Sequence, residues 1–302
     1  MKAILITGGS GFIGSSLTEL LLQKGYIVNH LSRSAKPADG KVNVFKWDVV
    51  KGEIDPACIE QVDTVIHLAG EGIADRPWTN ARKAAIINSR TASIRLIYSL
   101  LERTPNHGIK ALISSSAVGF YGNGGDAILH ETSPPGTGFL ARTCEEWEIA
   151  AEEGARFFSR IVKLRTGVVL DKGKGALPQI AKPILSGLGS PLGDGKQWVP
   201  WIHIADLISI YAYVLENESL AGVFNATAPN PVTNTELTEA IASKLGKTLW
   251  LPKVPAFMLK IILGEMSKVV LNSNRTSAEN ILSSGFSFEF NTIEKALNNI
   301  YD

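Results

Sequence analysis

A glycine-rich turn between a strand-like and a helical segment constrains the fold of this chain more than any other feature. The segment 2–7 is short and apolar, as a buried strand is. The segment 13–24 places Ile13, Leu17 and Leu21 at helical spacing, and Gly25 follows as a helix terminator. Between the two segments lies the sequence GGSGFIG. Glycines here let the chain turn sharply and let backbone approach a ligand closely.

Strand-like and helical segments continue to alternate after this unit. The further strand candidates are 26–31, 42–47, 64–69, 110–115, 161–169 and 223–226. Several are continuously apolar, as strands covered on both faces of a parallel sheet are. This alternation predicts an α/β protein with a doubly wound parallel sheet, the Rossmann fold.

The alternation of strand-like and helical segments stops after Leu170. A Gly- and Pro-rich stretch covers 173–200, a strand-like start returns at Trp201, and helices with loops dominate from about residue 230. We therefore expect a Rossmann domain made of 1–172 and 201–228. A smaller, mostly helical C-terminal substrate lobe would be made of 173–200 and 229–302.

Composition and charge exclude several classes of protein. The formal net charge is +1 and no block of like charge stands out, which argues against nucleic-acid and membrane-surface proteins because both need clustered Lys and Arg. Cys58 and Cys144 are too few and too distant in sequence for a disulfide framework or a zinc site. The most apolar run, 254–266, is shorter than the about 18 residues of a membrane span and carries Lys260 and Glu265.

The first strand begins at residue 2, so we expect no signal peptide. These features predict a cytoplasmic protein, a monomer or homodimer, that acts on a small-molecule substrate. We expect no metal and no nucleic-acid or membrane partner.

The glycine turn indicates a dinucleotide site. It satisfies Gly9-x-Gly11-x-x-Gly14, and in another register Gly8-x-x-Gly11-x-x-Gly14, between a strand and a helix. A helix N-terminus there offers N–H donors and partial positive charge to a pyrophosphate. The expected contacts come from Gly8, Gly9, Ser10, Gly11, Phe12, Ile13 and Gly14. The alternative is a structural turn without a ligand.

The end of the second strand favours NADP over NAD. It reads Ser32-Arg33-Ser34, with no carboxylate before Asp39. An acidic side chain there would bind the ribose 2′-hydroxyl of NAD and repel a 2′-phosphate, whereas Arg33 would pair with that phosphate. One charge-assisted bond of about 1.5–3 kcal/mol gives a tenfold to hundredfold preference. The alternative is a solvated surface arginine.

The third and fourth strands end in further candidate cofactor contacts. Asp48 is placed to accept a hydrogen bond from the adenine amine, although it could equally initiate a turn. Leu68, Ala69 and Gly70 would present small side chains and backbone to the ribose and phosphates.

The motifs TGGSGFIG, HLAG, SSSAVGFYG, LRTGVVL and WIHIADL occur in this order. With them the sequence resembles the extended short-chain dehydrogenase/reductase family, and most of all its atypical epimerase-like branch, over essentially the whole chain. The resemblance implies NADP(H) at the ends of the strands, with Ser32 and Arg33 at the 2′-phosphate. It also implies cofactor contacts from Leu68, Ala69, Arg90, Ser114 and Val169, the last near the nicotinamide.

The proton relay that the resemblance implies is incomplete. Ser116 occupies the place of the catalytic serine, but its expected partner, a Tyr-x-x-x-Lys on the next helix, is absent. Aligned on Trp147-Glu148, the two positions hold Leu140 and Cys144; shifted by one, they hold Phe139 and Thr143. Tyr121 could substitute from the preceding loop, although a tyrosine in such a turn is more often structural.

Two segments hold candidate substrate contacts, one with Trp78 and the other, a loop of the small lobe, with Gln197 and Trp201. Trp78, Gln197 and Trp201 are expected near a substrate, where the aromatic rings could stack on a sugar or base. The alternative for each tryptophan is core packing. His203 and Asp206 could form an acid–base pair, but a structural histidine is the stronger expectation.

Two functional hypotheses follow. The first is an NADP-dependent oxidoreductase or epimerase-like enzyme that acts on a small carbonyl or sugar-nucleotide substrate. The alternative is a non-catalytic NADP-binding regulatory protein, which the missing Tyr-x-x-x-Lys favours.

Overall fold

The computed structural model describes residues 3–34 and 42–302 and is built on one eight-stranded sheet. Its order is β12-β8-β6-β5-β1-β2-β3-β4, and its neighbours are parallel apart from the antiparallel pair β3–β4. The strands are β1 (Ala3–Thr7), β2 (Ile27–Ser32), β3 (Val42–Asp48), β4 (Glu53–Ile54), β5 (Val62–His67), β6 (Ala111–Ala117), β8 (Arg160–Thr166) and β12 (Gly222–Ala226).

The strand order places a crevice at the centre of the sheet. From β1 the chain builds outward through β2 and β3, then returns to the other side of β1 with β5 and continues through β6 and β8. Ligands of doubly wound sheets bind beyond the carboxyl ends of the strands at such a reversal. The predicted Rossmann fold is confirmed, and the candidate site is expected between the ends of β1 and β5.

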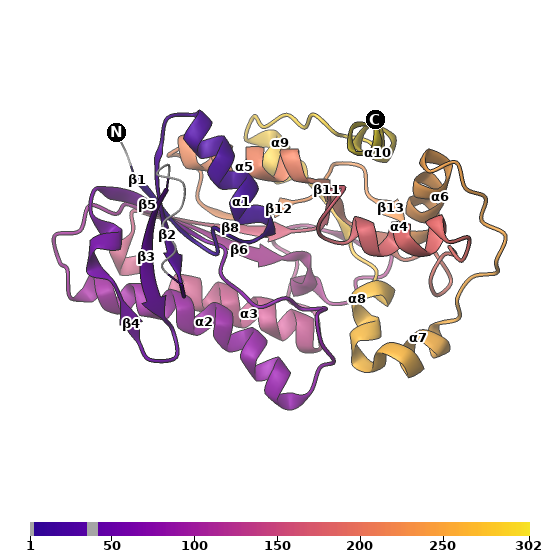
Figure 1. Cartoon of the computed structure of the whole chain (residues 1–302), viewed down its shortest axis with the longest axis horizontal. Coiled ribbons are helices and arrows are strands. Elements are labelled where there is room, and N and C mark those ends of the chain that lie inside the picture. Colours follow the sequence, from indigo (N-terminus) through magenta and orange to yellow (C-terminus); the bar gives the residue numbers. More distant parts are fainter. Residues whose placement is uncertain (1–2, 35–41) are drawn as a thin grey trace.

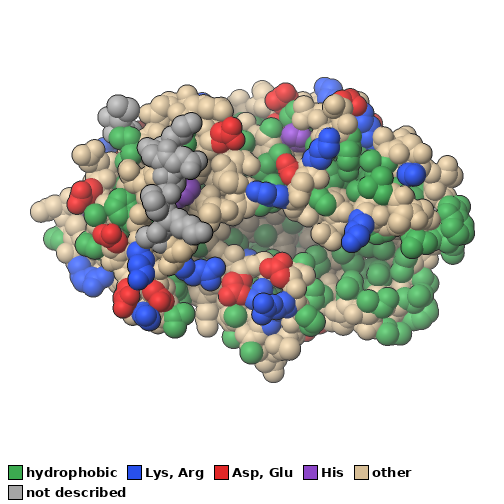
Figure 2. All heavy atoms as spheres, viewed as in Figure 1, with side chains coloured by type: hydrophobic (Ala, Val, Ile, Leu, Met, Phe, Trp, Pro, Cys, Tyr) green, Lys and Arg blue, Asp and Glu red, His purple; other side chains and the backbone are tan. Residues whose placement is uncertain are grey.

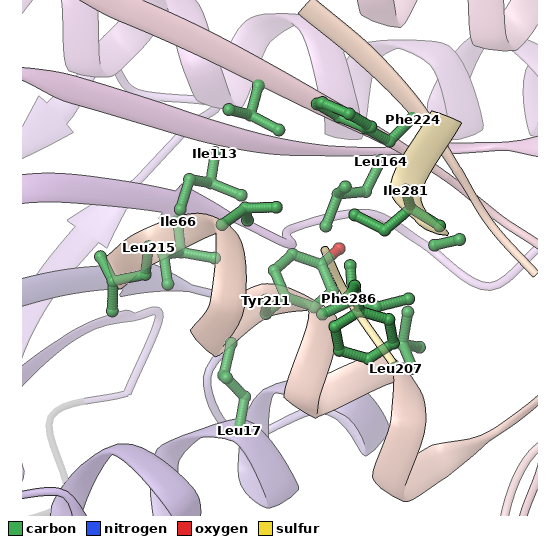
Figure 3. Packing of buried hydrophobic residues seen from close by; sticks show 14 of the residues in the cluster. Leu17, Ile66, Ile113, Leu164, Leu207, Tyr211, Leu215, Phe224, Ile281 and Phe286 are labelled. Atoms are coloured by element: carbon green, nitrogen blue, oxygen red, sulfur yellow. The ribbon is translucent and has the colours of Figure 1, made fainter. Parts of the chain in front are cut away.

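Helices cover both faces of the sheet (Figure 1). The helices α1 (Phe12–Gln23) and α5 (Ile204–Glu216) lie on one face, and α2 (Asn80–Glu102) and α3 (Phe139–Glu152) on the other. In the first core Leu17 of α1 and Tyr211 of α5 pack with Ile66, Ile113 and Leu164 of the strands (Figure 3). Removing these apolar side chains from water is the main stabilising contribution to the sheet.

The segment expected as one strand, 161–169, is two strands in the structure. β8 ends at Thr166, and β9 (Val168–Leu170) leaves the sheet to pair with β11 (Trp201–His203). Gly167 lies between them, where a Cβ atom would come within 2.2 Å of the Pro200 carbonyl oxygen. The close approach of the two segments therefore interrupts the strand, a tertiary effect that an apolar sequence pattern does not reveal.

A smaller, mostly helical lobe follows the sheet. Its core joins α4 (Leu177–Leu185), α6 (Asn234–Lys244) and α10 (Ile293–Tyr301) around the buried Trp201. In a short two-stranded antiparallel sheet, β10 (Trp198–Val199) pairs with β13 (Val232–Thr233). Beyond it lie α7 (Ala256–Leu263) and α8 (Lys268–Leu271). No helix in the described ranges has the length and hydropathy needed to cross a bilayer.

The expected division assigned all of 229–302 to the lobe. Within this range, the segment 278–286 packs on the sheet. Ala278, Ile281 of α9 (Glu279–Ser283) and Phe286 belong to the core beneath α1 and α5. Just before them, β14 (Arg275–Thr276) pairs with β7 (Ile128–Leu129). The chain thus returns across the sheet domain before α10 rejoins the lobe.

Candidate functional site

The ends of β1 and β5 are joined directly at the central crevice. The Thr7 hydroxyl oxygen accepts the backbone N–H groups of Leu68 and Ala69, each at 3.1 Å. Gly8 follows with a positive φ of 69°, and a Cβ atom there would lie 3.0 Å from the Leu68 carbonyl oxygen. Three of the predicted cofactor residues, Gly8, Leu68 and Ala69, therefore lie together.

The N-terminus of α1 is open for an anion. The helix begins at Phe12, its N-cap is Gly11, and within the described residues no side chain caps it. A Cβ atom on Gly14 would lie 2.3 Å from the Gly8 carbonyl oxygen, so only glycine lets the turn pack this tightly. A Cβ atom on Gly11 would have the Gly8 carbonyl oxygen, at 3.1 Å, as its only near contact among the described atoms. The first-turn N–H groups need a partner, and this geometry fits a pyrophosphate.

The His30 side chain packs against the glycine turn, a role that the sequence analysis missed. A Cβ atom on Gly9 would lie 2.3 Å from its Nε2 atom. Thr18 donates its hydroxyl hydrogen to the Gly14 carbonyl oxygen. His30 Nε2 lies 2.8 Å from the Thr18 hydroxyl oxygen, and because that hydroxyl has no second hydrogen, the histidine is the donor in this bond. Burial lowers the pKa of His30. A polar residue within the otherwise apolar strand YIVNHL was the available signal.

The ends of β2 and β3 bear on the choice of dinucleotide. Arg33 and Ser34 are exposed, and the Ser32 hydroxyl oxygen accepts the Ser34 N–H. Asp39 lies outside the described residues. Asp48 Oδ1 accepts the N–H groups of Val50 and Lys51, so this carboxylate closes a turn as the alternative interpretation held. Its contact with adenine stays a prediction.

Ser116 and Tyr121 belong to one buried polar network. Ser116 donates to Glu148 at 2.7 Å, and Glu148 accepts two bonds from Arg165 at 2.8 and 2.9 Å. Arg165 also donates to the Tyr121 hydroxyl at 3.0 Å, and Tyr121 donates to the Asn225 side-chain oxygen at 2.6 Å. The network ties β6, α3, β8 and β12 together.

This network does not support the expected catalytic roles of Ser116 and Tyr121. Both side chains are almost fully buried, with 2% and 3% of their surface exposed. Burial raises the pKa of Tyr121 against the opposing effect of Arg165, and the phenol hydrogen is already donated to Asn225. Both hydroxyl hydrogens are thus donated within the protein, and catalytic roles for Ser116 and Tyr121 stay predictions.

The place of the missing relay is occupied by two side chains that do not ionise near neutral pH. A Cβ atom on Gly119, just after β6, would lie 3.4 Å from Leu140 Cβ and 3.5 Å from Cys144 Sγ. Leu140 and Cys144 therefore occupy the register that faces the end of β6. Burial raises the pKa of the Cys144 thiol to about 12. Neither side chain can do the work of tyrosine or lysine there.

Arg90 lies beside the end of β5, and its contact with a cofactor stays a prediction. A Cβ atom on Gly70 would lie 3.0 Å from its Cζ atom. The guanidinium donates to the carbonyl oxygens of Ile86 and Glu71 and lies 4.9 Å from the centre of the Trp147 ring. Its Nε atom is buried and has no partner in the described part of the chain.

The loop after β9 meets the N-terminus of α1. A Cβ atom on Gly175 would lie 2.8 Å from the Phe12 ring and 3.0 Å from the Val169 carbonyl oxygen. Phe12 and Val169, both predicted cofactor residues, are thus close to each other. Ser114, another of that set, is buried in the middle of β6 and pairs in register with His67, the last residue of β5.

A cavity of about 580 Å³ opens in the lobe, and Asn123 of the sheet domain also lines it. Its lining includes Asn123 from the loop after β6, Gln197, and Lys260 and Lys268 from the lobe. Gln197 donates to two backbone carbonyl oxygens, while its buried Oε1 atom has no partner in the described residues. A buried acceptor beside open space is suited to a ligand hydroxyl or amine.

Trp78 does not line this cavity, and its contact with a substrate stays a prediction. Its ring packs edge-on against Phe139 at 4.7 Å, and Lys83, 5.5 Å from the centre of the Phe139 ring, pairs with Glu265 of the cavity wall. Trp201 does not face a substrate. It is fully buried in the lobe core and donates its indole N–H to the Asn230 carbonyl oxygen, so the core-packing alternative describes it.

His203 and Asp206 do not form an acid–base pair. Asp206 accepts the backbone N–H groups of Glu289 and Phe290, at 2.9 and 3.0 Å. His203 accepts the Ala205 N–H at the start of α5, and its ring packs on Phe290. Both side chains therefore have structural roles.

Comparison with known proteins bears on the family. Residues 4–226 match the model of the NAD dependent epimerase/dehydratase family. The chain belongs to this family. Residues 254–300 match a domain of unknown function, DUF1731. The resemblance inferred from the motifs is thereby confirmed.

Relatives in the family span the whole chain. Epimerase family protein YfhF of Bacillus subtilis is 35% identical over 298 residues, which cover 98% of this chain and 97% of that protein. The crystal structure of human epimerase family protein SDR39U1 with NADPH has a TM-score of 0.86 and 30% identity, with 99% of both chains covered. A nucleoside-diphosphate sugar epimerase from Corynebacterium glutamicum has a TM-score of 0.80 and 30% identity; the match covers 99% of this chain and 58% of that one.

Proposed function

We propose that this protein binds NADP(H) in the crevice between the ends of β1 and β5. The observation that carries the proposal is the open N-terminus of α1, where Gly11 leaves room for a pyrophosphate and no side chain among the described residues caps the helix. The structural relative SDR39U1 was crystallised with NADPH, which supports the same ligand class here.

The preference for NADP(H) rests on the end of β2. Arg33 is exposed there between two serines, and none of the three side chains is a carboxylate. A 2′-phosphate would receive a charge-assisted bond from the guanidinium, whereas the 2′-hydroxyl of NAD would lack its usual acidic partner.

The chemistry that the family suggests is an oxidoreductase or epimerase-like reaction on a small carbonyl or sugar-nucleotide substrate in the cavity. A bound NADP(H) would exchange a hydride with such a substrate. The chain would orient the dinucleotide through Arg90, Leu68 and Ala69, and Gln197 Oε1 would accept a hydrogen bond from the substrate. The substrate oxygen also needs a group that moves a proton, and Leu140 and Cys144 do not provide one.

This last observation favours a second candidate, a non-catalytic NADP(H)-binding regulatory protein. The hydroxyls nearest to the relay position are engaged in a buried network, so the site retains the binding elements of the family without its proton transfer. In this case occupancy by NADP(H) would control the stability of the protein or its contact with a partner.

One experiment separates the two candidates. Titration calorimetry with NADPH measures binding, and NADPH absorbance in the presence of small carbonyls and sugar nucleotides measures hydride transfer. Binding with oxidation of NADPH supports the enzyme. Binding without oxidation across the panel supports the regulatory protein, and absence of binding contradicts both.

A further inference from the structure

Two lysines, Lys260 of α7 and Lys268 of α8, line the cavity of the lobe. Lys260 is the one charged residue of α7, and the large exposed side chains of this helix are apolar. Figure 2 shows hydrophobic side chains gathered over this end of the molecule, at the lower right. Within the described part of the chain, Lys260 has no carboxylate partner. The charge on this apolar helix is therefore placed at the cavity.

The carboxylates that line the cavity have cations of their own. Glu265 pairs with Lys83 of α2, outside the cavity lining. Lys253 donates to the backbone carbonyl oxygen of Asp194 at 2.6 Å, which brings a further ammonium group next to that residue. The two lysines of the cavity therefore supply positive charge that its two carboxylates do not balance.

Lys268 lies at the side of the cavity nearest to the sheet domain. A Cβ atom on Gly138, the N-cap of α3, would lie 3.7 Å from its Nζ atom, and Glu265 Oε1 lies 3.9 Å from the same nitrogen. No side chain in the described residues caps α3, and the first-turn N–H groups of a helix carry partial positive charge. An anion held by Lys268 is therefore attracted by this helix end as well.

Neutral polar groups complete the lining. Gln197 is 6% exposed and donates to the carbonyl oxygens of Leu192 and Val270, both at 3.0 Å, while its Oε1 atom has no partner in the described residues. Asn123 Oδ1 accepts the Ser273 N–H at 2.9 Å, so the amide hydrogens of Asn123 remain for a ligand. Hydroxyl groups both donate and accept, which suits this pair of side chains.

The lining of the cavity does not suit a nucleobase. None of the described residues that line it is aromatic. Stacking on an aromatic ring raises the affinity for a base by a factor of about 5–150. The volume of about 580 Å³ is typical of sites for small molecules, which measure about 300–1,000 Å³. The cavity therefore favours a small ligand without a base.

We propose that the cavity binds a small polyhydroxy acid, with its anionic group at Lys260 and Lys268 and its hydroxyls at Gln197 and Asn123. The anionic group is a carboxylate or a phosphate, since an ammonium group attracts both. The inference rests on the proposed function in that this acid is the substrate, and it narrows the substrate to one that is not a nucleotide. Binding of the acid itself needs no NADP(H).

Titration calorimetry on the full chain tests the proposal with D-gluconate, which carries a carboxylate, and sorbitol 6-phosphate, which carries a phosphate. We expect at least one of them to bind with a Kd of about 1 mM or lower. Sorbitol lacks the anionic group and hexanoate lacks the hydroxyls. Each should bind at least about tenfold more weakly than the better acid.

Three variants locate the site. Lys260→Gln and Lys268→Gln each remove a charge from the cavity, and we expect each to weaken binding of the better acid at least about tenfold. The matched control is Lys247→Gln, at an exposed position after α6 that does not line the cavity, and it should leave the affinity unchanged. Circular dichroism checks that the variants fold, which is expected because all three lysines are exposed.

Absence of binding of both polyhydroxy acids overturns the proposal. So does an affinity that survives both cavity variants, or one that falls equally in Lys247→Gln. UDP-glucose that binds more tightly than either acid, and whose binding is lost in Lys268→Gln, also overturns it because a nucleotide is then the occupant. NADPH titration of the same preparation keeps the two sites apart. Binding of NADPH without either acid refutes the acid site alone, and binding of an acid without NADPH refutes the cofactor site alone.

Discussion

The Ser116 hydroxyl donates to the Glu148 carboxylate at 2.7 Å, beneath the end of β6. The same carboxylate accepts two bonds from Arg165, and both charged side chains are less than 10% exposed. The serine at the family's catalytic position is thus tied to a buried ion pair. This relationship makes Ser116 part of a buried polar network that holds β6, α3 and β8 together.

Removing the charge of Glu148 should strongly destabilise the fold. Glu148→Gln leaves the Arg165 guanidinium buried without a counter-charge, and breaking such a pair costs about 3–5 kcal/mol. Urea unfolding measures the free energy. The matched control is Glu146→Gln on the same helix, whose partner Arg142 is exposed, and we expect it to change the free energy of unfolding far less than Glu148→Gln does. Equal effects of the two variants would contradict a structural role for the buried pair.

Tyr121→Phe should affect stability and not cofactor binding. The substitution deprives Asn225 and Arg165 of a buried partner, which costs about 1–3 kcal/mol. Urea unfolding and NADPH calorimetry on the same preparation separate the two effects. If the enzyme hypothesis holds for some substrate, turnover should also change little. A loss of turnover by orders of magnitude at unchanged stability would make Tyr121 a catalytic residue and refute the structural interpretation.

Stability should fall in mild acid because buried histidines must charge on unfolding. Complete burial, aided by the nearby Arg90, lowers the pKa of His67 to about 3. The unfolded state binds a proton below its pKa of about 6.5 and the folded state does not, so stability is lost as the pH falls from 6.5 towards 3. His67 alone accounts for a loss of about 2 kcal/mol at pH 5. Burial shifts His30 in the same direction.

Urea unfolding at pH 7 and pH 5 checks this dependence. His67→Gln carries no titrating group at this position and should lose less stability between the two pH values than the wild type does. The same loss in both proteins would show that His67 does not contribute.

Gly11→Val should abolish binding of the dinucleotide in a folded protein. The new side chain would fill the space over the N-terminus of α1 where the pyrophosphate is proposed to lie. Gly108→Val, where a Cβ atom meets only ordinary contact at 3.6 Å, is the control far from the crevice. NADPH calorimetry reports the affinity, and an unchanged affinity in Gly11→Val would refute the placement.

The Rossmann fold was predictable because its strands, helices and glycine turn are each determined by residues close together in the sequence. The apolar strands, the alternating helices and the glycine turn each follow from spacing within a dozen residues. The reversal at β1 follows from the doubly wound arrangement. The break at Gly167 was not predictable, because it depends on the approach of a segment more than 30 residues away.

The site was predictable only in part for the same reason. Gly8, Leu68 and Ala69 lie together because they end neighbouring strands. The partners of Tyr121 come from β8 and β12, and no spacing in the sequence reveals them. The position of the Trp201 ring could not be predicted, because the same local sequence is compatible with a ring that contacts a ligand and with a ring that packs in the core, where it lies.

The most direct test of the central claim compares NADPH with NADH by calorimetry in the wild type and in Arg33→Ala. We predict at least about tenfold tighter binding of NADPH by the wild type, from a charge-assisted bond to the 2′-phosphate. Arg33→Ala should remove most of that difference and leave NADH binding unchanged, while Arg103→Ala, at the far end of α2, should alter neither. Equal affinities for the two dinucleotides in the wild type, or a preference that survives Arg33→Ala, would contradict the account.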